Sequence, residues 1–185
     1  MKRREAIRYL GLGFAGVTFT AVLPPFVGCE QKRNDPTVTG LVFLNQEQFG
    51  MVRRISDIIL PETDSPGAGQ AGVAAFIDVM LRDCYYEQDQ QAFLQGLDRI
   101  KEDAERTGSA FRELDREQQT RLFRKEAEMK EGPSRFFVLM KELTLFGYFT
   151  SEVGATQALR YNPVPGKYEG CIPLSPGDKT WAIQS

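Results

Sequence analysis

Three glycines in residues 67–72 have a spacing that could do chemistry. The segment reads Gly-Ala-Gly-Gln-Ala-Gly, and Asp89 follows it. This is the spacing of a dinucleotide-binding turn, in which an acidic residue about 20 positions later binds the ribose. Such a turn cradles a phosphate only when a β-strand precedes it and a helix begins at its end. Residues 55–60 instead have a helical pattern that stops at Pro61, so we interpret the segment as a loop between helices.

Glu62 and Asp64 form a second candidate, directly before the glycines. Two neighbouring carboxylates can serve as general acid and base, or as oxygen ligands of a calcium ion. Both residues stand in a Pro- and Gly-containing segment with the composition of a turn. We therefore interpret them as turn residues.

The composition excludes several kinds of site. The sequence has no histidine, which removes the commonest metal ligand and the usual general base near neutral pH. Three cysteines are too few for a four-thiolate zinc site or iron–sulfur cluster. Lys plus Arg number 23 against 25 Asp plus Glu, a net charge of -2, which argues against nucleic-acid binding. We predict no catalytic residue, no cofactor-binding residue and no metal ligand in this chain.

The elements that would position any such group are helices. Asn45 with Gln48, and Asp115 with Gln118, have the spacing of capping boxes at helix starts. Pro61 should end the first helix. Apolar residues recur at helical spacing in five stretches, and strand-like alternation is missing. The predicted helices cover about residues 46–60, 73–84, 89–106, 116–127 and 135–150.

The fold class we predict is an all-α bundle of about five helices, residues 45–158, with an extended C-terminal arm, residues 159–185. The last helix is apolar on more than one face, so we expect it to be central. The arm holds Trp181, the only tryptophan, and four of the ten prolines. Proline at this density prevents a helix, whereas disordered segments are poor in aromatic residues. The arm should pack on the bundle, on a partner, or on both.

The first 28 residues have the pattern of a secretory leader. A basic start is followed by the uncharged residues 9–28, and polar residues return directly after Cys29. A permanent membrane helix is the alternative, which two adjacent prolines and four glycines in a short span disfavour. Residues 29–44 would then be a tether that leads to the bundle.

Two short motifs refine this interpretation by resemblance. Arg3 and Arg4, before a weakly hydrophobic, glycine-rich stretch, resemble a twin-arginine leader, the export route for folded proteins. Residues 26–29, Phe-Val-Gly-Cys, resemble a lipobox, in which Cys29 becomes the lipidated first residue. We therefore expect a periplasmic, membrane-associated protein that is held by a lipid anchor.

Cys84 and Cys171 remain once Cys29 is assigned to a lipid. An even pair in an oxidising compartment favours a disulfide, which would tie the arm to the second helix. The alternative is two separate buried thiols, because free cysteine behaves as a small apolar residue.

Five segments together resemble the gluconate 2-dehydrogenase subunit 3 family. They are residues 3–6 (RREA), 59–68 (ILPETDSPGA), 147–154 (GYFTSEVG), 161–166 (YNPVPG) and 170–174 (GCIPL). The resemblance covers nearly the whole chain, and the two C-terminal motifs are its most specific part.

The resemblance implies a non-catalytic small subunit of a periplasmic, membrane-associated dehydrogenase. The large subunit would be an FAD-dependent flavoprotein of the glucose–methanol–choline type that oxidises gluconate or a related sugar or glycoside. Electrons would leave through a c-type cytochrome that carries haem c. The small subunit would bind no cofactor itself, and would carry the export signal for the flavoprotein and stabilise it.

We expect the bundle to contact the flavoprotein through aromatic and neighbouring residues near its C-terminus. Two alternatives are a free-standing lipoprotein that binds a small ligand between its helices and an export chaperone that leaves after translocation. The expected contact residues are Tyr148, Phe149, Glu152, Tyr161, Asn162, Pro163, Tyr168 and Trp181.

Overall fold

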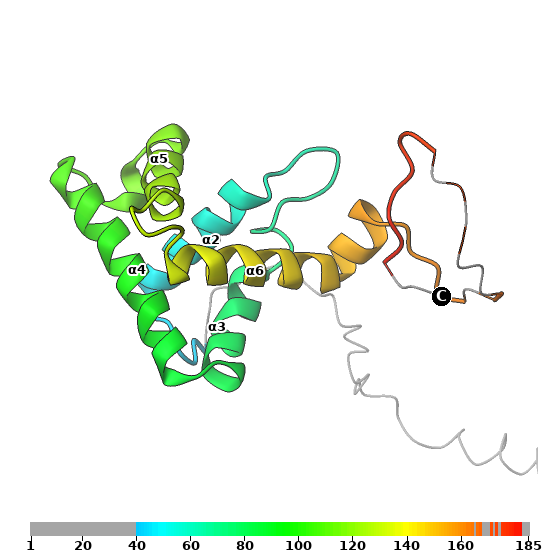
Figure 1. Cartoon of the computed structure of the whole chain (residues 1–185), viewed down its shortest axis with the longest axis horizontal. Helices are drawn as coiled ribbons and strands as arrows, with labels where there is room; N and C mark the ends of the chain where they lie inside the picture. Colours follow the sequence, from blue (N-terminus) through cyan, green and yellow to red (C-terminus); the bar gives the residue numbers. More distant parts are fainter. Residues whose placement is uncertain (1–39, 165, 168–170, 172, 174, 183–185) are drawn as a thin grey trace, which may run out of the picture. The chain divides into compact units, whose positions relative to one another are not determined.

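A computed structural model (Figure 1) describes residues 40–164, 166, 167, 171, 173 and 175–182. All of these residues belong to one compact unit, Val38–Ser185. Four residues to which the sequence assigned a role lie outside the described residues: Arg3, Arg4, Cys29 and Tyr168.

The described residues fold into helices and contain no β-strand, which confirms the predicted all-α bundle. The long helices are α2 (Gln46–Ile59), α3 (Val73–Cys84), α4 (Glu87–Arg106), α5 (Arg116–Ala127) and α6 (Arg135–Thr150). A 3-10 turn, η1 (Phe111–Glu113), precedes α5, and a π-helical turn, η2 (Gly154–Ala158), follows α6. The described residues after η2 contain no helix. No helix among the described residues combines the length and the apolar character that crossing a membrane requires.

Both predicted capping boxes are present. The Asn45 side chain accepts a hydrogen bond from the Gln48 backbone N–H (2.9 Å), and the Gln48 side chain accepts one from the Asn45 N–H (3.0 Å). Asp115 and Gln118 make the same reciprocal pair at the start of α5. These bonds satisfy N–H groups that have no partner inside the helix.

Helix α4 begins at Glu87, two residues before the predicted start at Asp89. The side chain of Gln90 explains the tight turn from α3, because its amide donates to the carbonyl oxygens of Leu81 (2.7 Å) and Tyr85 (3.1 Å). A carbonyl at the end of α3 thereby finds a partner. No capping pattern in the sequence signals this long-side-chain contact.

Helix α6 is central, as expected from its apolar faces. It contacts α2, α3, α4 and α5, and Figure 1 shows it running across the bundle. Two glycines permit close crossings: a Cβ added at Gly96 of α4 would overlap the Phe136 ring, and one at Gly147 would lie 2.6 Å from Cδ1 of Phe76. Helix α6 therefore packs directly on its neighbours at both crossings.

The segment that precedes α2 is fixed to α3 by one buried carboxylate. Asp78, 3% exposed, accepts hydrogen bonds from the N–H groups of Val42 (2.9 Å), Phe43 (3.1 Å) and Leu44 (2.7 Å). The Leu44 side chain is buried in the core. Residues 41–44 thus belong to the bundle, whereas residues 29–39 of the expected tether, residues 29–44, lie outside the described residues.

Replacing Asp78 tests the importance of this attachment. We expect Asp78→Ala to lower the free energy of unfolding by about 2–4 kcal/mol, because it leaves three N–H groups without their acceptor. Asp98→Asn, an exposed change on α4, is the control and should cost less than about 0.5 kcal/mol. Urea unfolding followed by circular dichroism measures both. Equal midpoints for the two variants would contradict the prediction.

Thr144 of α6 differs from Asp78, because its buried polar group has no partner among the described residues. Its hydroxyl oxygen is fully buried and has no hydrogen-bond partner among the described residues. Thr144→Val removes this unsatisfied polar group at nearly constant volume, so we expect stability to rise by about 1 kcal/mol. In the matched control, Thr120→Val on α5, the lost hydroxyl donates to the Arg116 carbonyl (2.7 Å). Thermal unfolding should therefore separate the two variants, and a Thr144→Val protein less stable than Thr120→Val would refute the expectation.

Candidate partner-binding site

The glycine segment folds back onto α2, and a helix rather than a strand precedes it. The Gly69 N–H donates to Oδ1 of Asp57 (2.6 Å), and a Cβ on Gly69 would overlap that carboxylate. A Cβ on Gly67 would lie 2.9 Å from the Glu62 nitrogen. The glycines are needed for this close approach, and the carboxylate that occupies the turn would repel a phosphate. The segment is an interhelical loop, as the sequence indicated.

Two of the acidic candidates, Glu62 and Asp89, also have structural partners. Glu62 is exposed and accepts from the Gln70 side chain (2.7 Å). Asp89 accepts from Nε of Arg135 (2.7 Å), and this hydrogen bond with the guanidinium lowers the pKa of the Asp89 carboxyl from its usual value. Among the described residues, no group of three or more Cys, Asp or Glu side chains could hold a metal ion. These carboxylates connect parts of the fold.

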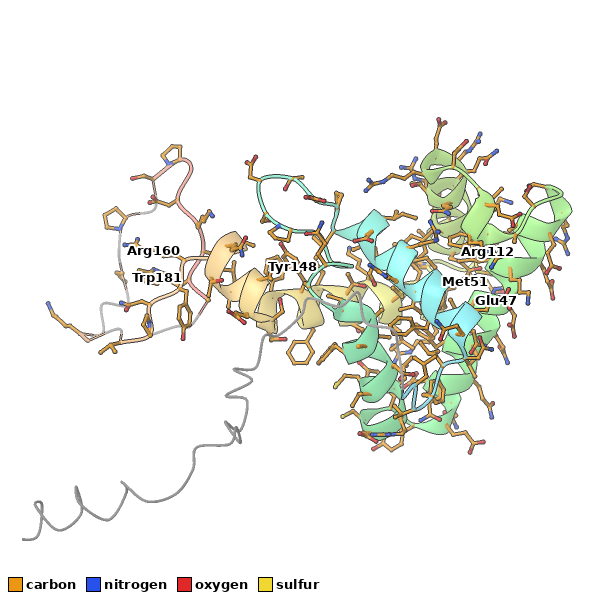
Figure 2. The ribbon with its side chains drawn as sticks, turned by 180° about the vertical axis from the view of Figure 1, so that it is seen from behind. Glu47, Met51, Arg112, Tyr148, Arg160 and Trp181 are labelled. Atoms are coloured by element: carbon orange, nitrogen blue, oxygen red, sulfur yellow. The ribbon has the colours of Figure 1, made fainter. Side chains whose placement is uncertain are left out.

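Tyr148 lies inside the chain, although the sequence suggested it as a partner contact. It is 4% exposed, its hydroxyl donates to the Pro66 carbonyl (2.8 Å), and the Ser65 hydroxyl lies 3.1 Å away. Figure 2 shows Tyr148 on α6 beside the loop that follows α2. Tyr148 therefore fastens this loop to α6, and its hydroxyl is not free for a partner.

Large apolar side chains remain exposed where α3 and α6 pack together. Phe146 is 53% exposed and Val79 43%. The Phe146 ring packs edge-on against Phe76, with centroids 5.6 Å apart, and the Phe149 ring packs in the same way against Tyr148, at 5.3 Å. We call Phe76, Val79, Phe146 and Phe149 the α3–α6 apolar surface. Sequence reasoning identified Phe149 but missed Phe146, three residues earlier and hence on the same side of the helix.

The remaining expected contacts differ in exposure. Glu152, Tyr161 and Pro163 are exposed. Asn162 is half-buried, and its side chain accepts from the Val164 N–H (3.2 Å). Trp181 is also half-buried, beneath the guanidinium of Arg160.

Cys84 and Cys171 are both free and exposed, so the expected disulfide is absent from the structure. The alternative of two buried thiols fails as well. Cys84 ends α3, whereas the Lys179 side chain in the arm donates to the Gln157 carbonyl of η2, and residues 180–182 bond to Arg160 just after η2. These described contacts hold the arm beside η2.

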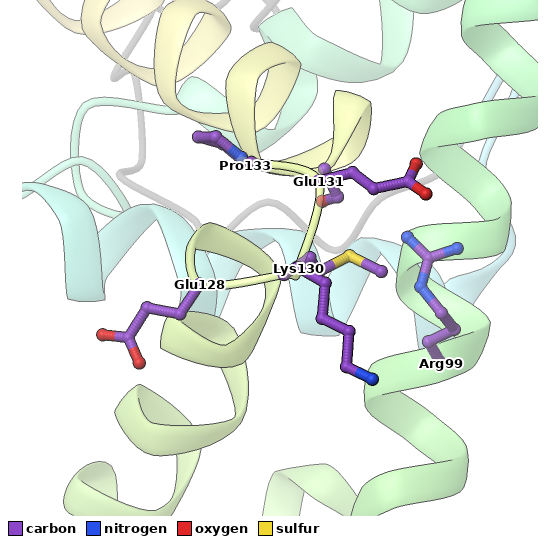
Figure 3. A pocket seen from close by; sticks show the side chains of 8 residues that line it. Arg99, Glu128, Lys130, Glu131 and Pro133 are labelled. Atoms are coloured by element: carbon purple, nitrogen blue, oxygen red, sulfur yellow. The ribbon is translucent and has the colours of Figure 1, made fainter.

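A hollow of about 770 Å³ lies between α4 and the turn that joins α5 to α6 (Figure 3). It is open, and Arg99 in its wall is already paired with Glu126 through two hydrogen bonds (2.7 and 3.0 Å). Figure 3 shows the Glu128 side chain pointing away from Arg99. A small-ligand site needs an enclosed apolar pocket with converging polar groups. The residues around this hollow do not form one. The lining residues are Arg99, Glu128, Met129, Lys130, Glu131, Gly132, Pro133 and Ser134.

The role of Tyr148 can be tested by Tyr148→Phe. Loss of the hydroxyl leaves the Pro66 carbonyl without its donor, so we expect a destabilisation of about 1 kcal/mol and faster proteolysis of residues 61–67. Tyr86→Phe, at a tyrosine that is 84% exposed, should change neither quantity. Chemical unfolding and limited proteolysis with mass spectrometry provide the measurements. If the loop is cleaved at the same rate in both variants, Tyr148 does not hold it.

Comparison with known proteins covers the elements just described. A family model described as Gluconate 2-dehydrogenase subunit 3 matches residues 46–166, from the start of α2 through η2 to Gly166. Neither the curated proteins nor the solved structures include a match to the chain. Because the match includes every helix of the bundle and more than half of the chain, the chain belongs to the gluconate 2-dehydrogenase subunit 3 family, and this membership implies a subunit of a gluconate 2-dehydrogenase complex.

Proposed function

We propose that the chain is the non-catalytic small subunit that binds and stabilises the FAD-dependent large subunit of its dehydrogenase complex. Family membership implies a place in such a complex. The observation that carries the finer role is the α3–α6 apolar surface.

This surface has the properties of a protein contact. Contiguous exposed apolar groups are characteristic of interaction sites, and aromatic rings supply much of the binding energy at interfaces. The rings of Phe146 and Phe149 are already supported by Phe76 and Tyr148. Binding would therefore cost little additional side-chain ordering.

The contacts of three carboxylates also support an assembly role. Asp57, Glu62 and Asp89 each accept a hydrogen bond from another part of the fold. A general acid or base must instead reach a substrate. In our proposal the flavoprotein holds the FAD and carries out the oxidation of gluconate or a related sugar, and a c-type cytochrome with haem c receives the electrons.

The export part of the proposal rests on the leader sequence. Arg3 and Arg4 would direct a folded pair of subunits to the twin-arginine route. Lipidation of Cys29 would then hold the complex at the periplasmic side of a membrane. Because the small subunit would bind native flavoprotein and not the unfolded chain, it would stabilise its partner by about 2.7 kcal/mol at a concentration of 100 times Kd.

Removing two rings tests the proposal. We expect Phe146→Ala with Phe149→Ala, in the full chain coexpressed with the flavoprotein, to weaken their association at least about tenfold, since buried aromatic contacts dominate binding energies. The matched control is Tyr86→Ala, which removes a more exposed aromatic side chain at the turn between α3 and α4. Copurification and dehydrogenase activity in the membrane fraction are the readouts.

The isolated double variant should keep its helical content, because both rings are exposed. Undiminished copurification of flavoprotein with the double variant would contradict docking on this surface. Dehydrogenase activity from the small subunit alone would contradict a non-catalytic role.

A further inference from the structure

We infer that residues 161–164 form a preformed contact for the flavoprotein subunit, and that Arg160 and Trp181 position this segment without touching the partner, an inference that rests on the function proposed above. The sequence suggested Trp181 as a contact residue itself. Its surroundings in the structure favour a different role.

The two ends of the arm are joined beside η2. The Arg160 N–H donates to the Thr180 carbonyl (2.8 Å), and the Ala182 N–H donates to the Arg160 carbonyl (3.0 Å), so that residues 160 and 181 form a parallel β-bridge. The ammonium of Lys179 donates to the Gln157 carbonyl, in the last turn of η2. These bonds fix where the arm leaves the bundle and where it returns.

Side chains reinforce the bridge. The guanidinium carbon of Arg160 lies 4.2 Å from the centre of the Trp181 ring, a cation–π contact. Figure 2 shows the two labelled residues next to each other, beyond the end of α6. Trp181 is half-buried by these contacts. The face of the Trp181 ring contacts Arg160 of the same chain, so Trp181 is a positioning residue.

The segment that follows Arg160 is stiff and exposes apolar groups. The Asn162 side chain accepts from the Val164 N–H (3.2 Å), which forms an Asx turn, and Pro163 restricts the backbone between them. Val164 is 78% exposed and Tyr161 46%. A short apolar segment that is ordered before binding pays less conformational entropy when it docks.

The position of residues 161–164 in the chain indicates which partner would cover them. Helix α6 carries Phe149 near its end, and η2 leads directly from there to Arg160. π-helical turns are frequent at functional sites, and Gly154 is required in this one because a Cβ would overlap the Tyr148 carbonyl. The segment thus continues the α3–α6 apolar surface along the chain. The same flavoprotein would cover both, with an apolar recess for Tyr161 and Val164.

The positioning role can be measured without the partner, because Trp181 is the only tryptophan. Its fluorescence reports on the arm alone. In the isolated full chain, Arg160→Ala should shift the emission to longer wavelength and accelerate proteolysis of the arm, while the melting of the helices stays unchanged. Arg160→Lys keeps a cation and should restore much of the wild-type signal. Arg124→Ala, an exposed arginine of α5, is the control. Unchanged emission in Arg160→Ala would overturn the positioning role.

The contact itself is measured with the flavoprotein. We expect Tyr161→Ala with Val164→Ala to weaken binding about tenfold while Trp181 emission in the isolated chain stays unchanged. Arg160→Ala should weaken binding about threefold.

The outcomes separate this inference from the proposed function. Wild-type binding by the Tyr161/Val164 variant, together with loss of binding by the Phe146/Phe149 variant, would overturn the inference and leave the function standing. If neither double variant loses binding, both ideas fail.

Discussion

The burial of α6 is the constraint on which the rest of the structure depends. A helix that is apolar on more than one face must be covered, and the four other long helices all contact it. Neighbouring helices pack closely on α6 at Phe136. The centre of the Phe136 ring lies 5.0 Å from that of Phe93 and 6.2 Å from that of Phe123. Gly96 has no side chain and so allows Phe136 to approach α4. Towards its C-terminal end the helix keeps Phe146 and Phe149 exposed. The same apolar character therefore supplies both the core and the proposed docking surface.

Three polar side chains connect this core to its loops. Asp57 accepts a hydrogen bond from the glycine loop, and Tyr148 donates one to Pro66 just before that loop. Asp78 accepts hydrogen bonds from the segment that precedes α2. These contacts satisfy backbone groups, most of them partly buried and that of Leu44 fully buried. Carboxylates used in this way stiffen a scaffold, which suits a subunit that presents a fixed surface to a larger protein.

Ion pairs between helices contribute less to this scaffold. Lys101 with Glu47 is an exposed pair of the kind that adds little stability in water. Arg99 with Glu126 differs, because the Glu126 side chain is only 8% exposed and the contact is bidentate. Removing Arg99 alone would leave that carboxylate desolvated and unpaired. The pair consequently fixes how α5 sits on α4.

The sequence by itself determined the features that depend on near neighbours in the chain. The capping pair of Asn45 and Gln48 and the stop at Pro61 involve residues a few positions apart, so their hydrogen bonds and steric limits form wherever the chain goes. Only the tertiary structure decided that Tyr148 is internal, that Cys84 and Cys171 remain unbonded, and that Asp78 binds residues 42–44. The bonds of Tyr148 and Asp78 join groups more than thirty positions apart in the chain, and such pairings depend on how the helices pack around α6.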